Sequence, residues 1–334
     1  MGQGAYILGC EGPRLSATEA AFFREADPWG FILFARNVES PEQLQALTRD
    51  LRLAVGRDAP ILVDQEGGRV QRLTAPHWRQ WMAPLDHVAA SGDMAERSMW
   101  LRSRLIADEL QTVGIDVNCA PTADVASAHT HPFLRNRCYG EDPGVVSAVS
   151  RAVADGLLAG GVAPVIKHIP GHGRALVDSH KDLPRVTEDK VTLASYDFAP
   201  FAALADLPMA MTAHIVFQAI DDQPATMSAP MIDVIRKDIG FSGLLMTDDI
   251  SMKALAGTLD QLCATSLAAG CDVVLHCNGD LVEMQAVANA SGAMTGDAQR
   301  RADSAAAARN AGQAIDIEAV EEELRTLMNG VVYV

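Results

Sequence analysis

Positive charge is scarce in this chain of 334 residues, which carries 27 lysines and arginines against 43 aspartates and glutamates. The formal net charge at pH 7 is −16. Because a protein that binds a phosphate backbone needs a basic face, this balance argues against a nucleic-acid partner. Solubility is a sufficient reason for a strongly acidic surface.

Long apolar runs and an export signal are also missing. No stretch of about 18 apolar residues without charges occurs, which is the length that a membrane-spanning helix needs. The first residues, M-G-Q-G-A-Y, lack the basic start and the apolar centre of a secretory signal. We therefore expect a cytoplasmic protein without a membrane partner, and we expect it to be a monomer.

Cysteine pairs are absent from the sequence. The six cysteines, at positions 10, 119, 138, 263, 271 and 277, include no C-x-x-C motif, and several lie in apolar runs. Free, buried thiols in a reducing compartment fit this pattern better than a disulfide framework.

Eight short apolar runs alternate with segments of helical pattern. The runs lie at residues 5–8, 30–34, 60–63, 116–119, 163–166, 209–212, 244–246 and 272–276. Each is nearly continuous in apolar character, as expected of strands that are buried on both faces. The alternation predicts a (β/α)8 barrel, with a doubly wound open sheet as the alternative.

The segments between the runs predict helices at residues 18–26, 41–55, 94–113, 143–158, 198–205, 231–239, 259–269 and 281–290. Thr18 is the expected cap of the first helix, and Ser40 with Pro41 is the expected start of the second. An Ala-rich and then Glu-rich tail predicts terminal helices from about residue 297. Because no repeat and no low-complexity linker occurs, we expect residues 1–334 to form a single domain.

Residues 167–184 concentrate titratable groups in a segment that is neither a plain helix nor a plain strand. The segment holds three of the nine histidines, His168, His172 and His180, and it is broken by a proline and two glycines. We predict a buried strand that ends in Lys167 and His168 and continues into a long loop. Loops of this size in a compact domain are usually functional or disordered.

Asp178 and His180 are two residues apart, so in an extended loop they lie on the same side. A carboxylate that accepts from an imidazole raises the histidine pKa and leaves a proton to donate near neutral pH. The alternative is a surface loop in which both residues are incidental.

In a (β/α)8 barrel the chemistry lies at the carboxyl ends of the strands, and polar side chains follow most of the predicted strands. These are Asp64, Asn118 leading to Asp124, Lys167 with His168, His214, Asp248 with Asp249, and His276. Adjacent residues of a strand point to opposite sides, so we expect only one of Asp248 and Asp249 to face a pocket. The other can cap the following turn, in competition with Ser251.

Two further sets of residues, one around Asp64 and one around His168, could bind a ligand or a metal ion. Asp64 with Arg69 and Arg72 offers an acceptor and two forked donors, and no G-x-x-x-x-G-K-[ST] phosphate loop is present. The spacing His168-x3-His172 falls in a loop without a nearby cysteine, which is the wrong context for a helical zinc pair. We therefore predict neither a metal ion nor a cofactor.

An ionised carboxylate and a protonated acid on opposing strand ends are the minimum equipment for cleaving a glycoside with retention. The carboxylate attacks the anomeric carbon, and the acid protonates the leaving oxygen. The usual acid is a carboxyl group, whereas this sequence offers a histidine beside an aspartate.

Several motifs resemble the β-N-acetylhexosaminidases of glycoside hydrolase family 3 in their single-domain bacterial form. They are K-H-I-P-G-H-G from residue 167, D-S-H at 178–180, T-D-D-I-S-M at 247–252, V-D-Q-E-G-G-R-V-Q-R at 63–72, and the loop 133–139. With the order of the predicted strands, the likeness covers about residues 5–290.

The resemblance implies a barrel that removes terminal β-linked N-acetylglucosamine with retention, and a muropeptide substrate salvaged in cell-wall recycling. It implies that Asp248 is the nucleophile and that His180, partnered by Asp178, is the general acid and then the base. It further implies a set of sugar-binding residues, namely Asp64, Arg72, Arg137, Lys167 and His168.

Two departures from the family pattern concern residues near these positions. Arg137 lies in H-P-F-L-R-N-R-C-Y-G, where the family more often has I-G-x-R-S-F-G, so Arg135 competes with it as the sugar-binding arginine. Ile169 replaces the commoner aromatic residue before Pro170.

Three other readings remain open at this point: a phosphorylase, hydrolysis assisted by the substrate's acetamido group, and a barrel that is either a silent carbohydrate binder or a metal-dependent hydrolase.

Overall fold

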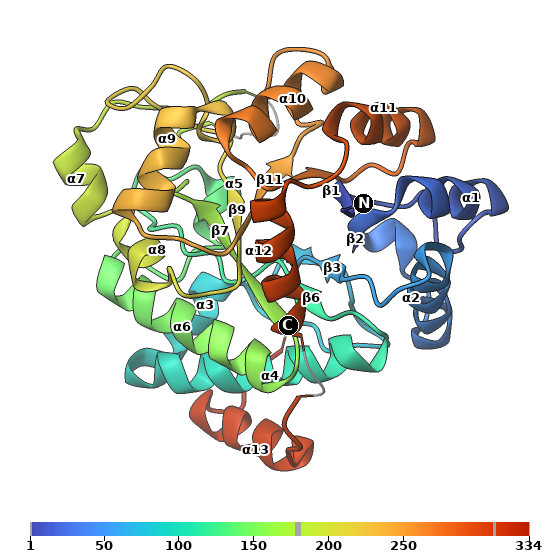
Figure 1. Ribbon diagram of the computed structural model, residues 1–334. Coiled ribbons are helices and arrows are strands. Elements are labelled where there is room, and N and C mark those ends of the chain that lie inside the picture. The colour runs from blue at the N-terminus through green and yellow to red at the C-terminus, as the bar shows by residue number, and fades with distance from the viewer. Residues whose placement is uncertain (1, 178–181, 310–311, 334) are drawn as a thin grey trace.

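The computed structural model describes residues 2–177, 182–309 and 312–333, and at its centre is a closed barrel of parallel strands (Figure 1). The barrel strands are β1 (Gly4–Leu8), β2 (Pro28–Leu33), β3 (Ile61–Val63), β6 (Val117–Asn118), β7 (Ala163–Ile169), β9 (Met209–Thr212), β11 (Leu244–Asp249) and β12 (Val273–His276). Pairing of β1 with β12 closes the ring. Each strand overlaps one of the predicted runs, so the (β/α)8 barrel is confirmed and the open sheet is excluded.

Helices surround the barrel (Figure 1), and the predicted ones occur in the expected order, whereas the short helices at residues 84–91, 132–135 and 190–195 were not predicted. The helices are α1 (Ala17–Ala26), α2 (Pro41–Val55), α3 (Pro84–Ser91), α4 (Ala95–Thr112), α5 (Pro132–Arg135), α6 (Pro143–Ala159), α7 (Lys190–Ser195), α8 (Ala199–Ala203), α9 (Ala229–Asp233), α10 (Leu259–Ala269) and α11 (Leu281–Ser291). None of the helices within the described ranges is both long enough and apolar enough for a membrane crossing.

The helix starts follow local capping chemistry. Ser40 accepts from the Gln43 amide and Pro41 occupies the first helical position of α2, as predicted. The expected Thr18 cap of α1 is wrong, because the cap is Ser16. Ser16 and Glu19 form a reciprocal capping box, which starts the helix before Thr18.

Short elements that the apolar pattern did not predict lie on the carboxyl side of the barrel. β4 (Gln65–Gly67) and β5 (Val70–Gln71) form an antiparallel hairpin directly after β3. β8 (Arg185–Val186) pairs with β10 (Val216–Phe217) after β7 and β9. These elements are two or three residues long, too short for any period to be visible in the sequence.

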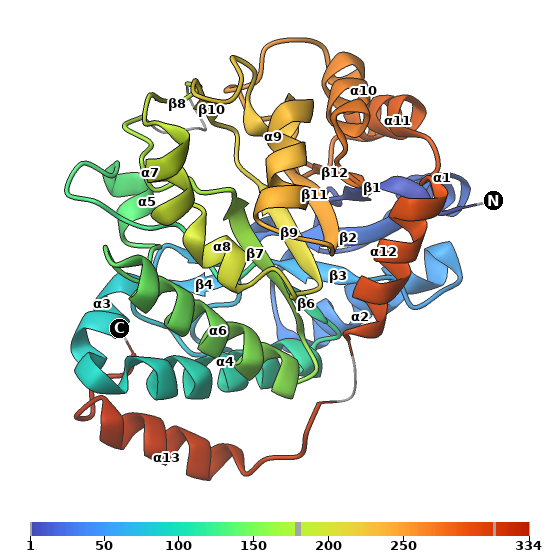
Figure 2. The same ribbon diagram turned by 60° about the vertical axis from the view of Figure 1, so that its left-hand side comes forward.

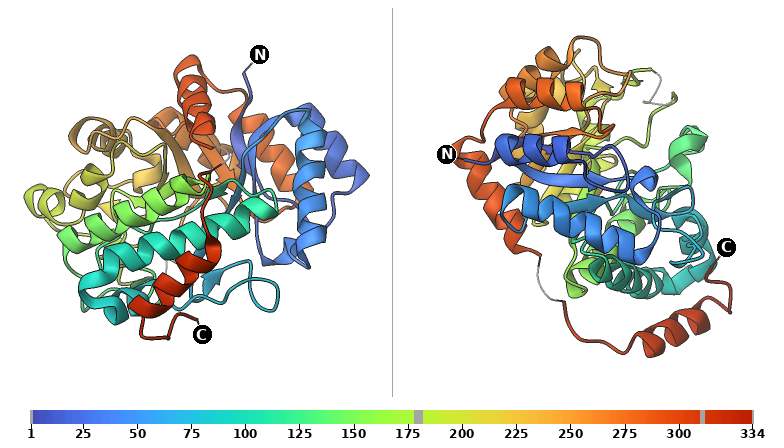
Figure 3. Two further views of the ribbon diagram at one scale, coloured as in Figure 1. Left: turned by 90° about the horizontal axis from the view of Figure 1, so that it is seen from below. Right: turned by 90° about the vertical axis from the view of Figure 1, so that its right-hand side faces the viewer.

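Two helices follow the last barrel unit, as expected. α12 (Gly296–Ala307) packs its alanines against residues of the barrel interior, and Arg301 binds Asp272 at the amino end of β12 with a 2.8 Å contact. α12 therefore covers the amino end of the barrel. α13 (Ile317–Leu327) runs alongside α4, where Glu323 pairs with Arg97 at 2.7 Å (Figures 2 and 3).

The barrel interior is packed with side chains and is not a channel. Inward residues of all eight strands, among them Ile7, Leu62 and Met246, form one buried cluster with α12. Two other buried clusters fill the space between the strands and the outer helices. With its amino end covered and its centre filled, the barrel leaves its carboxyl rim as the place for a ligand.

Candidate active site

A cavity of about 240 Å³ opens among the carboxyl ends of the barrel strands. Its wall includes every predicted site residue that the structure describes, namely Asp64, Arg72, Arg137, Lys167, His168 and Asp248. The other two predicted residues, Asp178 and His180, lie outside the described residues. The structure thus brings together residues from five separate segments of the chain.

Local irregularities in two strands aim neighbouring residues at this cavity. The register of β7 against β9 shifts between Lys167 and Ile169, and both Lys167 and His168 line the cavity. The register of β11 against β12 shifts in the same way between Met246 and Asp249. Such bulges change the direction of side chains and are frequent beside active sites.

Asp64 is held as an anion between two cations. Lys167 Nζ lies 2.7 Å from Asp64 Oδ1, and Arg72 Nη2 lies 2.8 Å from Asp64 Oδ2. Burial alone would raise the pKa of Asp64, but Lys167 and Arg72 outweigh it and hold the pKa well below its ordinary value. Each carboxylate oxygen keeps a lone pair, so Asp64 can still accept a hydroxyl from a ligand.

Glu66 is a residue of this network that the sequence did not single out. Arg137 donates to both of its carboxylate oxygens, at 2.9 and 2.8 Å, and Lys167 Nζ lies 2.6 Å from Glu66 Oε1. Burial would raise the Glu66 pKa, but Arg137 and Lys167 lower it to about 2. The family pattern had placed Glu66 inside a quoted motif, yet only the fold shows what it contacts.

The same contacts separate the two competing arginines. Arg137 is buried in the cavity wall and bound to Glu66, whereas Arg135 pairs with Glu141 at 2.6 Å and is partly exposed. Arg135 is absent from the residues that line the cavity. The geometry therefore favours Arg137 as the arginine that a ligand would meet.

Asp124 fixes the orientation of His168. His168 Nδ1 lies 2.7 Å from Asp124 Oδ2, and the His172 amide donates to Asp124 Oδ1 at 2.6 Å. Burial would raise the Asp124 pKa, but His168 and His172 lower it, so the carboxylate is ionised and can only accept. Nδ1 of His168 therefore carries a proton, and Nε2 points toward Arg137 Nη2 at 3.3 Å.

Asp248 and Asp249 divide their tasks much as expected. Asp249 Oδ1 accepts from the Ser251 amide and hydroxyl at 3.1 and 2.9 Å, which closes the turn after β11. Asp248 Oδ1 accepts from the Asp249 amide at 2.8 Å. Contrary to the expectation that only one faces the pocket, both line the cavity, because the register shift in β11 breaks the strict alternation.

His214 stands behind this pair and was noted in the sequence only as a strand-end residue. Its Nε2 donates to the Asp249 carbonyl oxygen at 2.9 Å, and its Nδ1 lies 2.8 Å from the Thr226 hydroxyl. Burial would raise the Asp248 pKa, but His214, His168 and the Asp249 amide outweigh it and lower the pKa. Asp248 is therefore an ionised carboxylate in a largely enclosed wall, as a nucleophile requires.

The rest of the wall is apolar or aromatic. The Arg72 guanidinium lies 5.1 Å from the Phe34 ring centre, and that of Arg69 lies 3.7 Å from the Phe133 ring centre. A cavity with convergent polar groups on one side and apolar surface on the other suits a sugar, which has hydroxyls and C–H faces. Among the described residues no group of three or more His, Cys, Asp or Glu is arranged to hold a metal ion.

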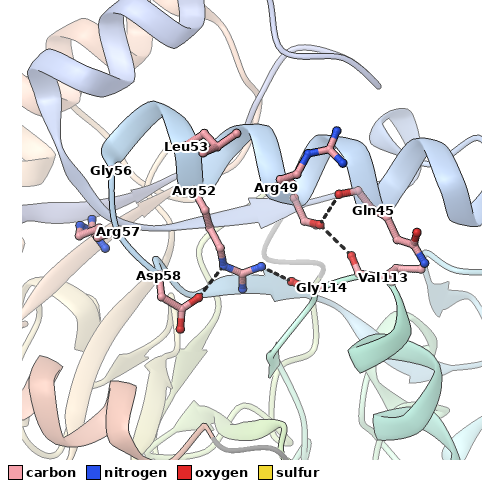
Figure 4. A pocket seen from close by; sticks show the side chains of 10 residues that line it. Gln45, Arg49, Arg52, Leu53, Gly56, Arg57, Asp58, Val113 and Gly114 are labelled. Carbon is pink, nitrogen blue, oxygen red and sulfur yellow. Dashed lines mark hydrogen bonds and ion pairs between the residues drawn. The ribbon is translucent and has the colours of Figure 1, made fainter.

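A larger hollow, of about 600 Å³, lies at the opposite end of the strands (Figure 4). Arg52 reaches across it from α2, donating to the Gly114 carbonyl oxygen at 2.9 Å and pairing with Asp58 at 2.9 Å. These contacts of Arg52 connect α2 to the segments that lead into β3 and β6. Conserved chemistry in barrels lies at the other end, so this hollow is a structural joint.

Comparison with known proteins agrees with this geometry. Residues 11–309 match the family model of the glycosyl hydrolase family 3 N-terminal domain. The β-hexosaminidase of Alkalilimnicola ehrlichii is 38% identical over 293 residues, which is 82% of this chain and 81% of that protein. The β-hexosaminidase of Xylella fastidiosa is 36% identical over 285 residues, 83% of this chain and 84% of that protein.

Solved structures show the same barrel. Native NagZ from Neisseria gonorrhoeae superposes with a TM-score of 0.84 at 28% identity, over 99% of this chain and 97% of that chain. The complex of the same enzyme with N-trifluoroacetyl-D-glucosamine gives a TM-score of 0.85. The chain therefore belongs to glycosyl hydrolase family 3 and is a glycosidase of the β-hexosaminidase type.

Proposed function

We propose that the protein is a retaining exo-β-N-acetylglucosaminidase that removes terminal β-linked N-acetylglucosamine. The observation that carries this proposal is the cavity in which Asp64, Arg72, Arg137, Lys167 and His168 surround the ionised Asp248. The NagZ complex with an N-acylglucosamine analogue supports the choice of sugar. We further propose a muropeptide substrate from cell-wall recycling, a cytoplasmic location and a monomeric state, all of which rest on the family resemblance and the sequence.

In the proposed mechanism Asp248 attacks the anomeric carbon, and the bond to the leaving oxygen breaks as His180 gives that oxygen its proton. The product of this step is a glycosyl ester on Asp248. His180, now neutral, takes a proton from water, and the resulting hydroxide displaces Asp248 from the anomeric carbon. Two inversions restore the β configuration.

His180 and Asp178 enter this mechanism from the sequence motif alone. Asp178 would hold the imidazole in one tautomer and stabilise its protonated form. Asp64, Arg72, Arg137, Lys167 and His168 would bind the sugar hydroxyls. The reaction needs an anion on one face of the anomeric carbon and a proton donor at the leaving oxygen on the other face, and Asp248 and His180 would supply them from separate segments of the chain.

The first test compares Asp248→Asn with Asp249→Asn on an aryl β-N-acetylglucosaminide. We expect Asp248→Asn to lower kcat at least about a thousandfold, because the amide is a poor nucleophile. Asp249→Asn should cost much less, because its carboxylate is used by Ser251. Equal losses in the two variants would contradict the assignment of Asp248 as the nucleophile.

The anomer of the first product, followed by NMR, tests retention directly. Release of the α anomer would exclude the double displacement. A rate that rises with added phosphate would indicate a phosphorylase. A rate that falls in the presence of a chelator would indicate a metal-dependent hydrolase. A 2-fluoro sugar trapped covalently on Asp248 would exclude attack by the acetamido group.

His180→Ala tests the acid and base role. The loss of rate should be largest for substrates with poor leaving groups, since these need the proton most. An unchanged dependence of rate on pH would contradict the role.

A further inference from the structure

Glu66 is buried behind the cavity and does not line it. Its side chain is 1% exposed, and it contacts Arg137 and Lys167. Both of these cations do line the cavity. Glu66 can therefore influence a ligand only through the two residues it holds.

The backbone of Glu66 is itself fixed on both sides. Buried Arg102 donates from Nη2 to the Glu66 carbonyl oxygen at 2.8 Å. The preceding residue, Gln65, exchanges hydrogen bonds with the Asn118 side chain at 3.0 and 3.1 Å. The carboxylate of Glu66 thus projects from a rigid hairpin, which is what a group that positions others requires.

Charge balance shows what would change without this carboxylate. Three cations, Arg72, Arg137 and Lys167, meet two carboxylates, Asp64 and Glu66. Arg137 has no carboxylate within ion-pair distance other than Glu66 among the described residues. If Glu66 lost its charge, Lys167 would keep Asp64 as its one carboxylate partner and Arg137 would be drawn toward Asp64 as well, whose oxygens a sugar hydroxyl needs.

We propose that Glu66 is a positioning residue for sugar binding: it holds Arg137 and Lys167 in place and keeps Asp64 available to the ligand. This inference rests on the proposed function, because it takes Asp64, Arg137 and Lys167 as the groups that meet the sugar. If the ion pairs of Glu66 only stabilised the fold, removing its charge would lower stability without changing the affinity for the sugar.

The test compares Glu66→Gln, which keeps the shape and removes the charge, with Glu66→Asp, which keeps the charge on a shorter arm. The matched control is Glu109→Gln. Glu109 is also buried and paired with an arginine, Arg79 at 3.0 Å, but it does not line the cavity. The measurements are binding of N-acetylglucosamine by calorimetry, kcat and KM on an aryl β-N-acetylglucosaminide, and thermal unfolding.

We expect Glu66→Gln to weaken N-acetylglucosamine binding at least about tenfold, because it unbalances a desolvated charge network. KM should rise more than kcat falls. Glu66→Asp should recover most of the binding, and Glu109→Gln should lower thermal stability without changing the affinity or KM.

A folded Glu66→Gln variant with wild-type affinity and wild-type KM would overturn the proposal. If Glu66→Gln does not fold, Glu66→Asp decides. A loss of affinity in Glu66→Asp that is no greater than the loss in Glu109→Gln would mean that Glu66 has a purely structural role. Wild-type protein that binds the sugar without hydrolysing its glycosides would refute the proposed function and leave the Glu66 test intact. Failure of the wild type to bind the sugar at all would overturn both.

Discussion

His87 shows how a single buried side chain ties folding to pH. Its ring is fully buried in α3, and neither ring nitrogen has a hydrogen-bond partner within the described part of the chain. Burial, helped by the nearby Arg102 charge, lowers the His87 pKa from 6.5 to about 2. The folded protein therefore keeps His87 neutral, while the unfolded chain takes up a proton below pH 6.5.

The sign of the effect follows from this difference. Because the unfolded state binds the extra proton, the free energy of unfolding falls as the pH drops below the unfolded pKa. At pH 5 the loss from His87 alone is about 2 kcal/mol. We expect His87→Leu to remove this loss, so that the variant gains stability relative to the wild type between pH 7 and pH 5.

Urea unfolding at a series of pH values measures this gain. The exposed His77, changed to leucine, is the control and should leave the pH dependence unchanged. A His87→Leu variant whose stability falls with pH as steeply as that of the wild type would show that His87 is not the group responsible.

Single residues also mark the limit of what the sequence could predict about the site. The sequence could predict four residues of the cavity, because each lies at the end of a recognisable strand and within a family motif. They are Asp64, Lys167, His168 and Asp248. Glu66 could not be predicted, since its partner Arg137 is 71 residues away in the sequence and the contact exists only once the barrel has closed. The choice of Arg137 over Arg135 depended on the same contact.

At the scale of elements, the β4–β5 hairpin is the support of the candidate site. It carries Glu66, and Asp64 and Arg72 flank it. Gly67 in its turn has φ +109°, and a Cβ there would lie 1.8 Å from Arg102 Nη2 and 2.9 Å from the Met82 carbonyl oxygen. Glycine is required both by the backbone conformation and by the close approach of Arg102.

We therefore expect Gly67→Ala to displace Arg102 from the Glu66 carbonyl and to cost about 2 kcal/mol or more of stability. Affinity for N-acetylglucosamine should fall as well, because the hairpin positions Asp64 and Glu66. Gly12→Ala is the control, since a Cβ at Gly12 meets nothing within 4 Å. Unfolding by heat and binding by calorimetry measure the two effects, and a Gly67→Ala variant as stable as Gly12→Ala would contradict the steric argument.

The joint between α2 and the barrel offers the opposite expectation, a loss of stability without a loss of activity. Arg52 donates to the Gly114 carbonyl oxygen at 2.9 Å and to Asp116 at 2.8 Å, at the amino ends of the strands. Arg52→Met keeps the aliphatic stem and leaves Asp116 with one cation fewer. We expect a lower melting temperature with kcat and KM unchanged, and a change in KM would mean that this hollow communicates with the cavity.

The elements also show which parts of the fold a sequence can predict. Barrel strands such as β7 begin with an apolar run, here residues 163–166, and this pattern is visible because both faces of the strand are buried. Hairpin β4–β5 and pair β8–β10 are formed by strands of two or three residues, which are too short to show a period in the sequence. The β4–β5 hairpin carries Glu66 and lines the cavity through Val70, so an element that supports the candidate site was among the least visible in the sequence.

At the scale of the whole molecule, the C-terminal helices connect distant parts of the barrel. α12 closes the amino end through its buried alanines and Arg301. α13 packs Leu324, which is fully buried, toward α4 and the region of Trp81, whose ring lies 5.2 Å from that of Tyr333. These contacts are the physical basis for the prediction, still open, that residues 1–334 form a single domain.

A cooperative single domain and a barrel with a loosely attached tail respond differently when a buried side chain of α13 is shortened. Leu324→Ala should cost about 2–5 kcal/mol, because the site is fully buried. If α13 unfolds together with the barrel, calorimetry will show one transition moved as a whole to lower temperature, and N-acetylglucosamine will move that same transition upward. Leu53→Ala, at a leucine that is 68% exposed, should move it little. A separate low-temperature transition in Leu324→Ala, with the ligand-responsive transition unmoved, would mean that α13 folds apart from the barrel and that the single-domain prediction is wrong.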